Sequence, residues 1–174
     1  MHEPASWIPA YIGLGSNLDD PPAQLARALA ALATLPSSRL VAVSGFYRNP
    51  PLGPQDQPWY VNAAAALLTR LGPQALLVAL KGIEAAQGRQ RRPDDRWGPR
   101  VLDLDLLLYG SLRLDEPGLV LPHPGIAERN FVLFPLLEIA PALRVPGCGR
   151  AAGLARSLDG TNLECVRPAA AGHG

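Results

Sequence analysis

Residues 101–109, Val-Leu-Asp-Leu-Asp-Leu-Leu-Leu-Tyr, constrain the fold of this chain more than any other segment. The run is almost wholly apolar, and glycine and proline residues bound it on both sides, which predicts a buried β-strand. Side chains alternate faces along a strand, so Asp103 and Asp105 point the same way, with their Cα atoms roughly 6.6 Å apart. The opposite face points into a core and carries Leu102, Leu104 and Leu106.

The two carboxylates need something that offsets their repulsion. On a largely apolar strand, two such charges about 5 Å apart repel by roughly 3 kcal/mol at an effective dielectric constant of about 20. Mg²⁺ prefers oxygen ligands and is often held by one or two carboxylates together with substrate phosphates. Asp103 and Asp105 therefore predict a magnesium site. The alternative is that both lie on a solvated sheet face and bind nothing.

The segment before this strand is basic. Five of the sixteen Lys and Arg residues fall between positions 89 and 100, among glycine and proline residues typical of a loop: Arg89, Arg91, Arg92, Arg96 and Arg100. The guanidinium fork matches phosphate oxygens, so such a loop beside paired carboxylates suits a polyphosphate with Mg²⁺. The alternative is a solvated loop in which Asp94 and Asp95 pair with the arginines.

The composition is that of an ordinary globular domain. The 174 residues are 48% hydrophobic and 18% charged, with a net charge of +1, which gives no indication of nucleic-acid or anionic-membrane binding. The two cysteines provide neither a disulfide framework nor zinc spacing, and we identify no secretory signal or membrane span. We therefore expect a single domain over residues 1–174, monomeric and cytoplasmic, that binds small molecules and ends in a disordered tail at residues 168–174.

Periodicity and turn residues predict two helices and four strands, the strands at residues 11–15, 40–47, 59–69 and 101–109. The helices follow Asp20, as an N-cap, and the Gly72-Pro73 pair. The order βαββαβ is typical of a ferredoxin-like α+β fold, an antiparallel sheet with both helices packed on one face. Right-handed crossovers give the strand order 4-1-3-2, and the aspartates would line an open groove opposite the helices. A hairpin at residues 112–121 and a C-terminal helical extension at 131–140 follow.

Residues around the third predicted strand suit a flat ligand. A proline-rich loop at residues 48–58 is stiff, which would lower the entropy lost on contact with a ligand; the alternative, which the loop by itself favours, is a plain surface connection. Tyr60 and Asn62 share a strand face, and an aromatic ring beside an amide can recognise a planar heterocycle; core packing of Tyr60 is the alternative. We interpret Gly13 and Gly15 as close-packing positions rather than a dinucleotide-binding loop, because the third glycine of that motif is absent.

Several motifs in one order resemble the 6-hydroxymethyl-7,8-dihydropterin pyrophosphokinase family of folate biosynthesis. The resemblance runs over about residues 11–141 and is most specific in Arg96-x-Gly98-Pro99-Arg100-x-x-Asp103-Leu104-Asp105. Further matching segments are Gly15-Ser16-Asn17-Leu18, residues 51–58, Tyr60-x-Asn62-Ala63, Gln87-Gly88-Arg89, Leu121-Pro122-His123 and Arg129-x-Phe131-Val132-Leu133-x-Pro135-Leu136.

The resemblance implies a reaction and a set of roles. The β- and γ-phosphates of ATP pass together to the hydroxymethyl oxygen of the pterin, and AMP leaves. Asp103 and Asp105 would hold two Mg²⁺ ions per active site, and Arg89 and Arg100 would stabilise charge on the transferred group. The pterin would be bound by Asn49, Pro50, Leu52, Tyr60, Asn62 and Phe131. ATP would be bound by Lys81, Glu84, Arg89, Arg91, Arg92, Trp97, Arg100, Leu106, His123 and Arg129.

The chain departs from the usual family pattern at Asn49, Lys81 and Pro124, where Thr, Gln and an aromatic residue are common, and in the longer Asp94-Asp95 loop. From the residues alone, two other functions stay open. A nucleotidyltransferase would also use paired aspartates on an antiparallel sheet, but it would release pyrophosphate instead of AMP. A non-enzymatic ferredoxin-like binding module would show no metal dependence.

Overall fold

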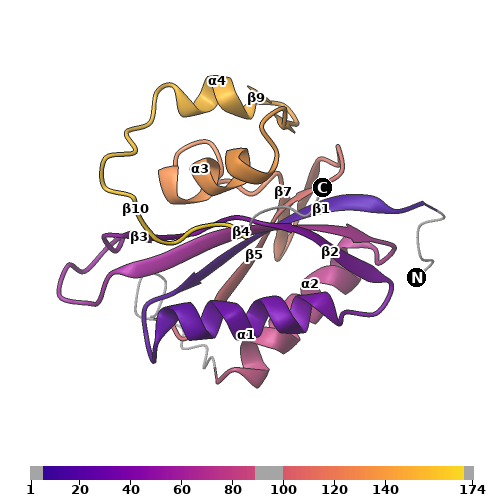
Figure 1. The fold of residues 1–174 in the computed structure, drawn as a ribbon. Helices are drawn as coiled ribbons and strands as arrows, with labels where there is room; N and C mark the ends of the chain where they lie inside the picture. Colours follow the sequence, from indigo (N-terminus) through magenta and orange to yellow (C-terminus); the bar gives the residue numbers. More distant parts are fainter. Residues whose placement is uncertain (1–5, 89–99, 171–174) are drawn as a thin grey trace.

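One antiparallel sheet forms the centre of the structure (Figure 1). The computed structural model describes residues 6–88 and 100–170. The sheet has six strands in the order β10-β3-β4-β1-β5, and β2 also pairs with β4. The strands are β1 (Ile8–Ser16), β2 (Ser38–Val43), β3 (Phe46–Asn49), β4 (Tyr60–Thr69), β5 (Asp103–Tyr109) and β10 (Glu164–Arg167).

The predicted order of the first four strands is confirmed. The order 4-1-3-2 corresponds to β5-β1-β4 followed by β2 and β3, and every one of these pairs is antiparallel. Two features differ from the prediction. The strand expected at residues 40–47 is split into β2 and β3, and β10 adds a further strand beside β3.

Side chains explain the split between β2 and β3. The hydroxyl of Ser44 accepts a hydrogen bond from the Ala64 N–H at 2.8 Å, while the Ser44 N–H donates to the Ala64 carbonyl at 2.9 Å. One residue later, the Gly45 N–H donates to the carboxylate of Glu138 at 2.6 Å. A hydroxyl and a carboxylate thus replace ladder partners at the bend, which keeps its backbone groups satisfied.

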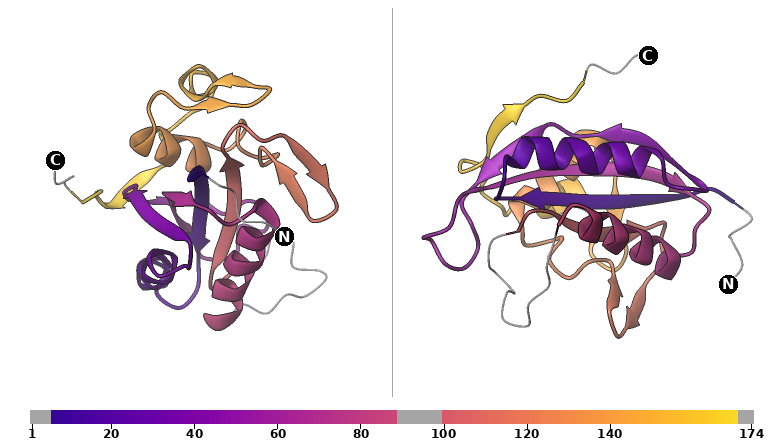
Figure 2. Two further views of the ribbon diagram at one scale, coloured as in Figure 1. Left: turned by 90° about the vertical axis from the view of Figure 1, so that its right-hand side faces the viewer. Right: turned by 90° about the horizontal axis from the view of Figure 1, so that it is seen from below.

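Helices cover both faces of the sheet. The α1 helix (Pro21–Ala33) and the α2 helix (Pro73–Ala86) lie on one face, and α3 (Asn130–Ile139) and α4 (Ala151–Ala155) lie on the other (Figures 1 and 2). The predicted placement of the first two helices on one face is correct. The opposite face is open only in part: α3 covers apolar side chains there, among them Ala64, Leu107 and Leu108, whereas Asp103 and Asp105 line a pocket on this face, as we expected.

Both main helices begin where the sequence predicts, each with a proline in the first turn. Asp20 is the N-cap residue of α1, but its side chain makes no capping hydrogen bond. The backbone of Asp20 is left-handed, with φ of 65°. Asp20 caps the helix through its backbone carbonyl, which accepts a hydrogen bond from the Gln24 N–H at 3.0 Å. The α1 helix buries Leu25 and Leu32 against the sheet, as their helical spacing predicts.

The strand β5 has the alternation that the sequence predicts. Leu102, Leu104 and Leu106 are all buried in the core between the sheet and the helices α1 and α2. The pairing of β1 with β5 then shifts register between Tyr11 and Ile12, which leaves Leu107 as an extra residue. This bulge interrupts the alternation, so Leu107 and Leu108 both join the second core, under α3.

Short hairpins complete the fold. The strands β6 (Leu114–Glu116) and β7 (Leu119–Leu121) form the hairpin predicted at residues 112–121, and β8 (Arg144–Val145) pairs with β9 (Gly149–Arg150). Within residues 6–88 and 100–170, no helix has the length and apolar character required to cross a lipid bilayer.

Candidate active site

A pocket of about 440 Å³ opens where β1, β4 and β5 meet the loop after β3 and the segment leading into α3. It unites residues that are far apart in the chain. Ten predicted site residues line it: Asn49, Leu52, Tyr60, Asn62, Arg100, Asp103, Asp105, His123, Arg129 and Phe131. The structure therefore brings most of the predicted site residues together in one pocket.

The two aspartates stand at one wall of the pocket, opposite glycines. Asp103 pairs with Gly15 and Asp105 pairs with Gly13 across the β1–β5 ladder. A side chain at Gly15 would be crowded, because an added Cβ would lie 2.8 Å from the Asn62 Oδ1 atom. Gly15 is therefore a close-packing position, as we interpreted it, whereas an added Cβ at Gly13 would meet Leu107 at an ordinary contact distance of 3.4 Å.

The chemistry of this wall suits Mg²⁺ in the presence of a phosphate ligand. Asp103 and Asp105 supply carboxylate oxygens on one strand face, beside an open pocket. No group of three or more His, Cys, Asp or Glu side chains suitable for a metal occurs in the described part of the chain. Because Mg²⁺ is commonly held by one or two carboxylates plus substrate oxygens, two aspartates fit such an ion when ATP supplies the other ligands.

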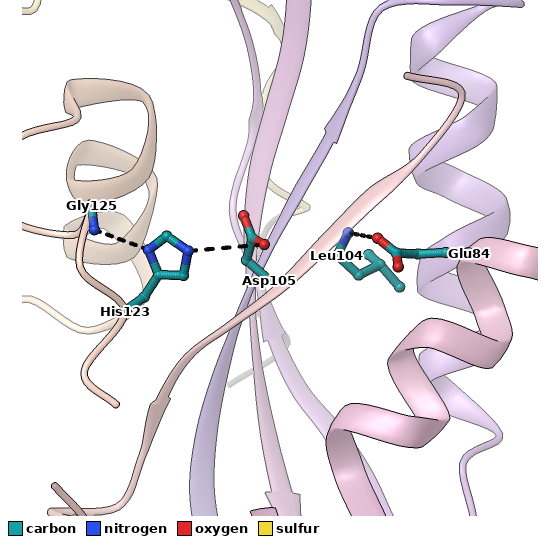
Figure 3. A network of polar contacts seen from close by, with 5 residues as sticks. All are labelled: Glu84, Leu104, Asp105, His123 and Gly125. Carbon is teal, nitrogen blue, oxygen red and sulfur yellow. Dashed lines mark hydrogen bonds and ion pairs between the residues drawn. The ribbon is translucent and has the colours of Figure 1, made fainter. Parts of the chain in front are cut away.

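His123 lies beside this acidic wall (Figure 3). Its Nδ1 atom accepts a hydrogen bond from the Gly125 N–H at 3.0 Å, and its Nε2 atom lies 4.0 Å from Oδ1 of Asp105. Burial lowers the pKa of His123, the Arg129 cation lowers it further, and Asp103 opposes the shift. We assign the neutral tautomer from this hydrogen bond: Nδ1 is the acceptor, so Nε2 carries the proton beside the pocket.

An amide pair forms the other side of the pocket. The Nδ2 atom of Asn62 donates a hydrogen bond to Oδ1 of Asn49, and Asn49 in turn donates to the Pro50 carbonyl at 3.0 Å. Both asparagines are buried, and both line the pocket together with the rings of Tyr60 and Phe131. An aromatic and amide surface of this kind suits a planar, polar heterocycle.

Three predicted nucleotide contacts and one predicted pterin contact lie outside the pocket lining. Leu106 is buried in the core between the sheet and the helices α1 and α2, and Lys81 is exposed on α2. Glu84 is buried, with an exposed fraction of 2%, and accepts the Leu104 N–H at 2.9 Å (Figure 3). Glu84 therefore does not form an exposed ion pair with Lys81, although the two residues are one helical turn apart. Pro50 is not among the lining residues, and its carbonyl accepts the hydrogen bond from Asn49.

Four further predicted site residues lie outside the described residues: Arg89, Arg91, Arg92 and Trp97. Their roles stay predictions from the family resemblance.

The sequence assigned no site role to several residues that line the pocket, notably Gly125 and Val132, and it marked Pro124 only as a departure from the family pattern. Gly125 has a clear physical role, because a Cβ atom there would lie 2.6 Å from the guanidinium carbon of Arg129. The His-Pro-Gly turn at residues 123–125 was the available signal, since a glycine in a tight turn often permits close approach by another group.

Proteins similar to this chain share one name. A protein of Pseudomonas aeruginosa is 55% identical over 136 residues, covering 78% of this chain and 83% of the relative. One of Methylorubrum extorquens is 49% identical over 157 residues, covering 90% and 98%. One of Haemophilus influenzae is 51% identical over 139 residues, covering 80% and 86%. All three are named 2-amino-4-hydroxy-6-hydroxymethyldihydropteridine pyrophosphokinase.

Solved structures show a similar fold. Wild-type Plasmodium falciparum HPPK-DHPS with pterin and p-hydroxybenzoate matches with a TM-score of 0.66 and 13% identity, over 86% of this chain and 43% of that chain. An HPPK-DHPS in complex with substrates matches with a TM-score of 0.67 and 13% identity, over 87% and 44%. This chain thus spans less than half the length of those proteins, and at such identity the likeness concerns the fold alone.

A family model settles the relationship. The model described as 7,8-dihydro-6-hydroxymethylpterin-pyrophosphokinase (HPPK) matches residues 11–141, which include all the residues that line the pocket. Together with relatives up to 55% identical over most of the chain, this match is decisive. The chain belongs to the 7,8-dihydro-6-hydroxymethylpterin-pyrophosphokinase family.

Proposed function

We propose that this protein transfers pyrophosphate from ATP to 6-hydroxymethyl-7,8-dihydropterin, giving the dihydropterin diphosphate and AMP, in folate biosynthesis. One observation carries the proposal: a single pocket joins the paired carboxylates Asp103 and Asp105 to an aromatic and amide wall at Tyr60 and Asn62. The first is suited to a metal-bound polyphosphate, and the second to a planar heterocycle. The relatives named for this activity support the same conclusion.

The pterin is proposed to bind on the amide side. Tyr60, from β4, and Phe131, from α3, offer ring faces on which a flat bicycle can stack. Asn62 and Asn49 hold each other through their hydrogen bond, so their amides are fixed before the ligand arrives. Fixed donors and acceptors lose little entropy on binding, which favours recognition of the polar edge of the pterin. Leu52 adds an apolar contact from the loop after β3.

The triphosphate is proposed to bind on the acidic side. Asp103 and Asp105 would hold Mg²⁺, two ions per active site, with oxygens of ATP as further ligands. When bound, Mg²⁺ neutralises phosphate charge and lowers the pKa of the attacking hydroxyl group. Arg100 and Arg129 line the same pocket and supply guanidinium groups suited to phosphate oxygens. The Nε2–H of His123 can donate to a phosphate oxygen without adding a charge.

The transfer itself is an in-line displacement. The hydroxymethyl oxygen of the pterin forms a bond to the β-phosphorus, and the bond from that phosphorus to the oxygen bridging the α-phosphorus breaks. AMP leaves with that oxygen, and the hydroxyl proton passes to solvent. The residues act mainly by positioning and by stabilising charge, as in other phosphoryl transfers. Arg89 is proposed to share this role with Arg100, and Arg91, Arg92 and Trp97 are proposed to contact ATP.

Further properties are proposed on the same basis. The βαββαβ part of the sheet is ferredoxin-like, with α3, α4 and β10 as a C-terminal extension. The chain works as one domain and as a monomer in the cytoplasm, and it binds neither nucleic acid nor membrane.

The decisive experiment identifies the product released from ATP. The protein is incubated with ATP, Mg²⁺ and 6-hydroxymethyl-7,8-dihydropterin, and nucleotides are separated by chromatography. We expect AMP in a one-to-one ratio with the pterin diphosphate. Release of pyrophosphate with a nucleotidylated product would identify a nucleotidyltransferase instead, and pterin binding without turnover would indicate a binding module.

A further inference from the structure

We propose that Asn17 is a positioning residue. It fixes Arg100 and the loop at residues 50–58 relative to each other, so that the two sides of the pocket keep a constant separation and orientation. This inference rests on the proposed function, because its main readout is turnover. Asn17 follows the last residue of β1, and its exposed fraction is 2%. It does not line the pocket, so its effect must pass through the groups that it holds.

The first set of contacts joins Asn17 to Arg100. The Asn17 N–H donates to the Arg100 carbonyl at 3.0 Å, and the Arg100 N–H donates to Oδ1 of Asn17 at 2.8 Å. These two bonds continue the contact between the β1 and β5 segments beyond the end of both strands. Both backbone polar groups of Arg100 are therefore fixed by one residue, and Arg100 itself lines the pocket.

The second set of contacts joins Asn17 to the loop before β4. The Nδ2 atom of Asn17 donates to Oε1 of Gln57 at 3.1 Å and to the Pro58 carbonyl at 2.9 Å. Gln57 is itself buried, and its Nε2 atom donates to the Leu52 carbonyl at 3.4 Å. Leu52 lines the pocket on its pterin side. A continuous chain of hydrogen bonds thus runs from Arg100, through Asn17 and Gln57, to Leu52.

The chemistry of the Asn17 side chain fits this double role. An amide offers one acceptor oxygen and two donor hydrogens, and here the oxygen serves Arg100 while the nitrogen serves the loop. A carboxylate keeps the acceptor but loses both donors, and alanine loses everything. These two substitutions therefore separate the Arg100 half of the bridge from the loop half. Misplacement of a catalytic group by about 1 Å can cost roughly 10²-fold in rate.

The test compares steady-state constants for the full-length protein and its variants. We expect Asn17→Ala to lower kcat by at least tenfold and to raise the KM for the pterin by at least fivefold. We expect Asn17→Asp, which retains the acceptor for the Arg100 N–H, to raise the pterin KM while kcat stays within about threefold. Gln57→Leu breaks the loop half from the other side and should behave like Asn17→Asp, so it serves if neither Asn17 variant folds.

A second experiment, a double-mutant comparison, tests whether Asn17 acts through Arg100. In an Arg100→Lys background, Asn17→Ala should lower kcat by less than twofold, because the group that it positions is already changed. The matched control is Thr69→Val. Thr69 is fully buried and bonds to Ser38 and the Leu71 N–H, but it does not line the pocket. Thr69→Val should destabilise the protein and leave kcat and the pterin KM within twofold.

Two results would overturn the inference. One is an Asn17→Ala protein that is folded and has kcat and pterin KM within twofold of wild type. The other is an equal loss of kcat from Asn17→Ala in the wild-type and Arg100→Lys backgrounds, which would indicate a general structural role. A wild-type protein without AMP release would refute the proposed function instead. In that case, faster amide exchange at Arg100 in Asn17→Ala, and at the non-proline residues of 50–58 in both Asn17 variants, would still support the bridge, and unchanged exchange would refute it.

Discussion

The Nε2 atom of His123 lies 4.0 Å from Oδ1 of Asp105, while its Nδ1 atom is held by the Gly125 N–H. The imidazole is therefore fixed as a neutral group beside a carboxylate, and not as the cationic half of an ion pair. A neutral N–H donor contributes no additional positive charge beside the proposed metal site. This arrangement leaves the negative charge of Asp103 and Asp105 available for the Mg²⁺ that we propose they hold.

Replacement of either aspartate should nearly abolish turnover. We expect Asp103→Ala and Asp105→Ala each to lower kcat by about 10²-fold or more, since each removes a carboxylate that we propose holds Mg²⁺ at the reacting phosphates. AMP release measures the loss, and circular dichroism should show an intact fold. Asp115→Ala, an exposed change in the β6–β7 hairpin, is the matched control. Substantial residual activity in both aspartate variants would contradict the metal assignment, as would full activity of wild type in excess EDTA.

Replacement of Glu84 should reduce stability. Glu84→Ala leaves the buried Leu104 N–H without its acceptor, which costs about 1–3 kcal/mol of unfolding free energy. Urea denaturation measures this cost, and Glu84→Gln, which keeps an acceptor oxygen, should recover part of it. Lys81→Ala, on the exposed surface of the same helix, should have little effect. A Glu84→Ala protein of normal stability but weakened ATP affinity would instead support the nucleoside contact that the family resemblance implied.

Stability should fall at alkaline pH through Tyr47. Burial raises the pKa of the Tyr47 hydroxyl above its usual value of 10, and the hydrogen bond that it donates to Glu138 raises it further. The folded state therefore keeps this proton at a pH where the unfolded chain releases it, so the stabilisation is complete below about pH 10 and declines above it. We expect Tyr47→Phe to flatten the fall in unfolding free energy between about pH 9.5 and 11.

A variant of Glu138, the partner of Tyr47, serves as a control with a smaller expected effect on the alkaline fall in stability. Glu138→Gln retains an acceptor for the hydroxyl but removes the nearby charge, so it should flatten the alkaline fall only in part. An alkaline fall as steep in Tyr47→Phe as in wild type would show that other groups cause it. Tyr109 is one such group, because burial raises its pKa as well.

A side chain at Gly45 should displace the C-terminal strand. An added Cβ would lie 2.9 Å from the Arg167 carbonyl, so Gly45→Ala should cost roughly 1–3 kcal/mol through overpacking. The cost should shrink in a chain that ends at Leu163, since Arg167 is then absent. Thermal denaturation of four proteins measures the cost in both backgrounds: wild type, Gly45→Ala, the chain that ends at Leu163, and the same shortened chain with Gly45→Ala. An equal cost with and without β10 would mean that the strain arises within β3 instead.

The parts of the fold that could be predicted depend on local patterns. The alternation of leucine and aspartate in β5 indicated its two faces, because the period of a strand fixes which side chains share a face. The leucine spacing and the prolines of α1 and α2 indicated those helices in the same way. In the pocket, local patterns indicated the aspartate pair, the basic residues before β5 and the shared face of Tyr60 and Asn62, whereas most other pocket residues were expected only from the family resemblance.

The parts that could not be predicted depend on distant partners. The bend at Ser44 and Gly45 is satisfied in part by Glu138, 93 residues further along the chain from Gly45. Glu84 lies three residues after Lys81, a spacing typical of a surface ion pair, but its partner is a backbone N–H of β5, which side-chain spacing does not reveal. The bulge at Leu107 similarly depends on how β1 and β5 pair.

The hydrogen bond between Glu84 and Leu104 has a consequence for how molecules of this protein behave in one another's presence. β5 is the last strand on its side of the sheet, and an uncovered final strand is a template on which strands of other chains can add. Here α2 lies against β5 and its buried carboxylate already occupies a donor that an incoming strand would need. We therefore expect the β5 edge of the sheet to resist the addition of strands from other molecules, which opposes fibril growth and aggregation at high protein concentration.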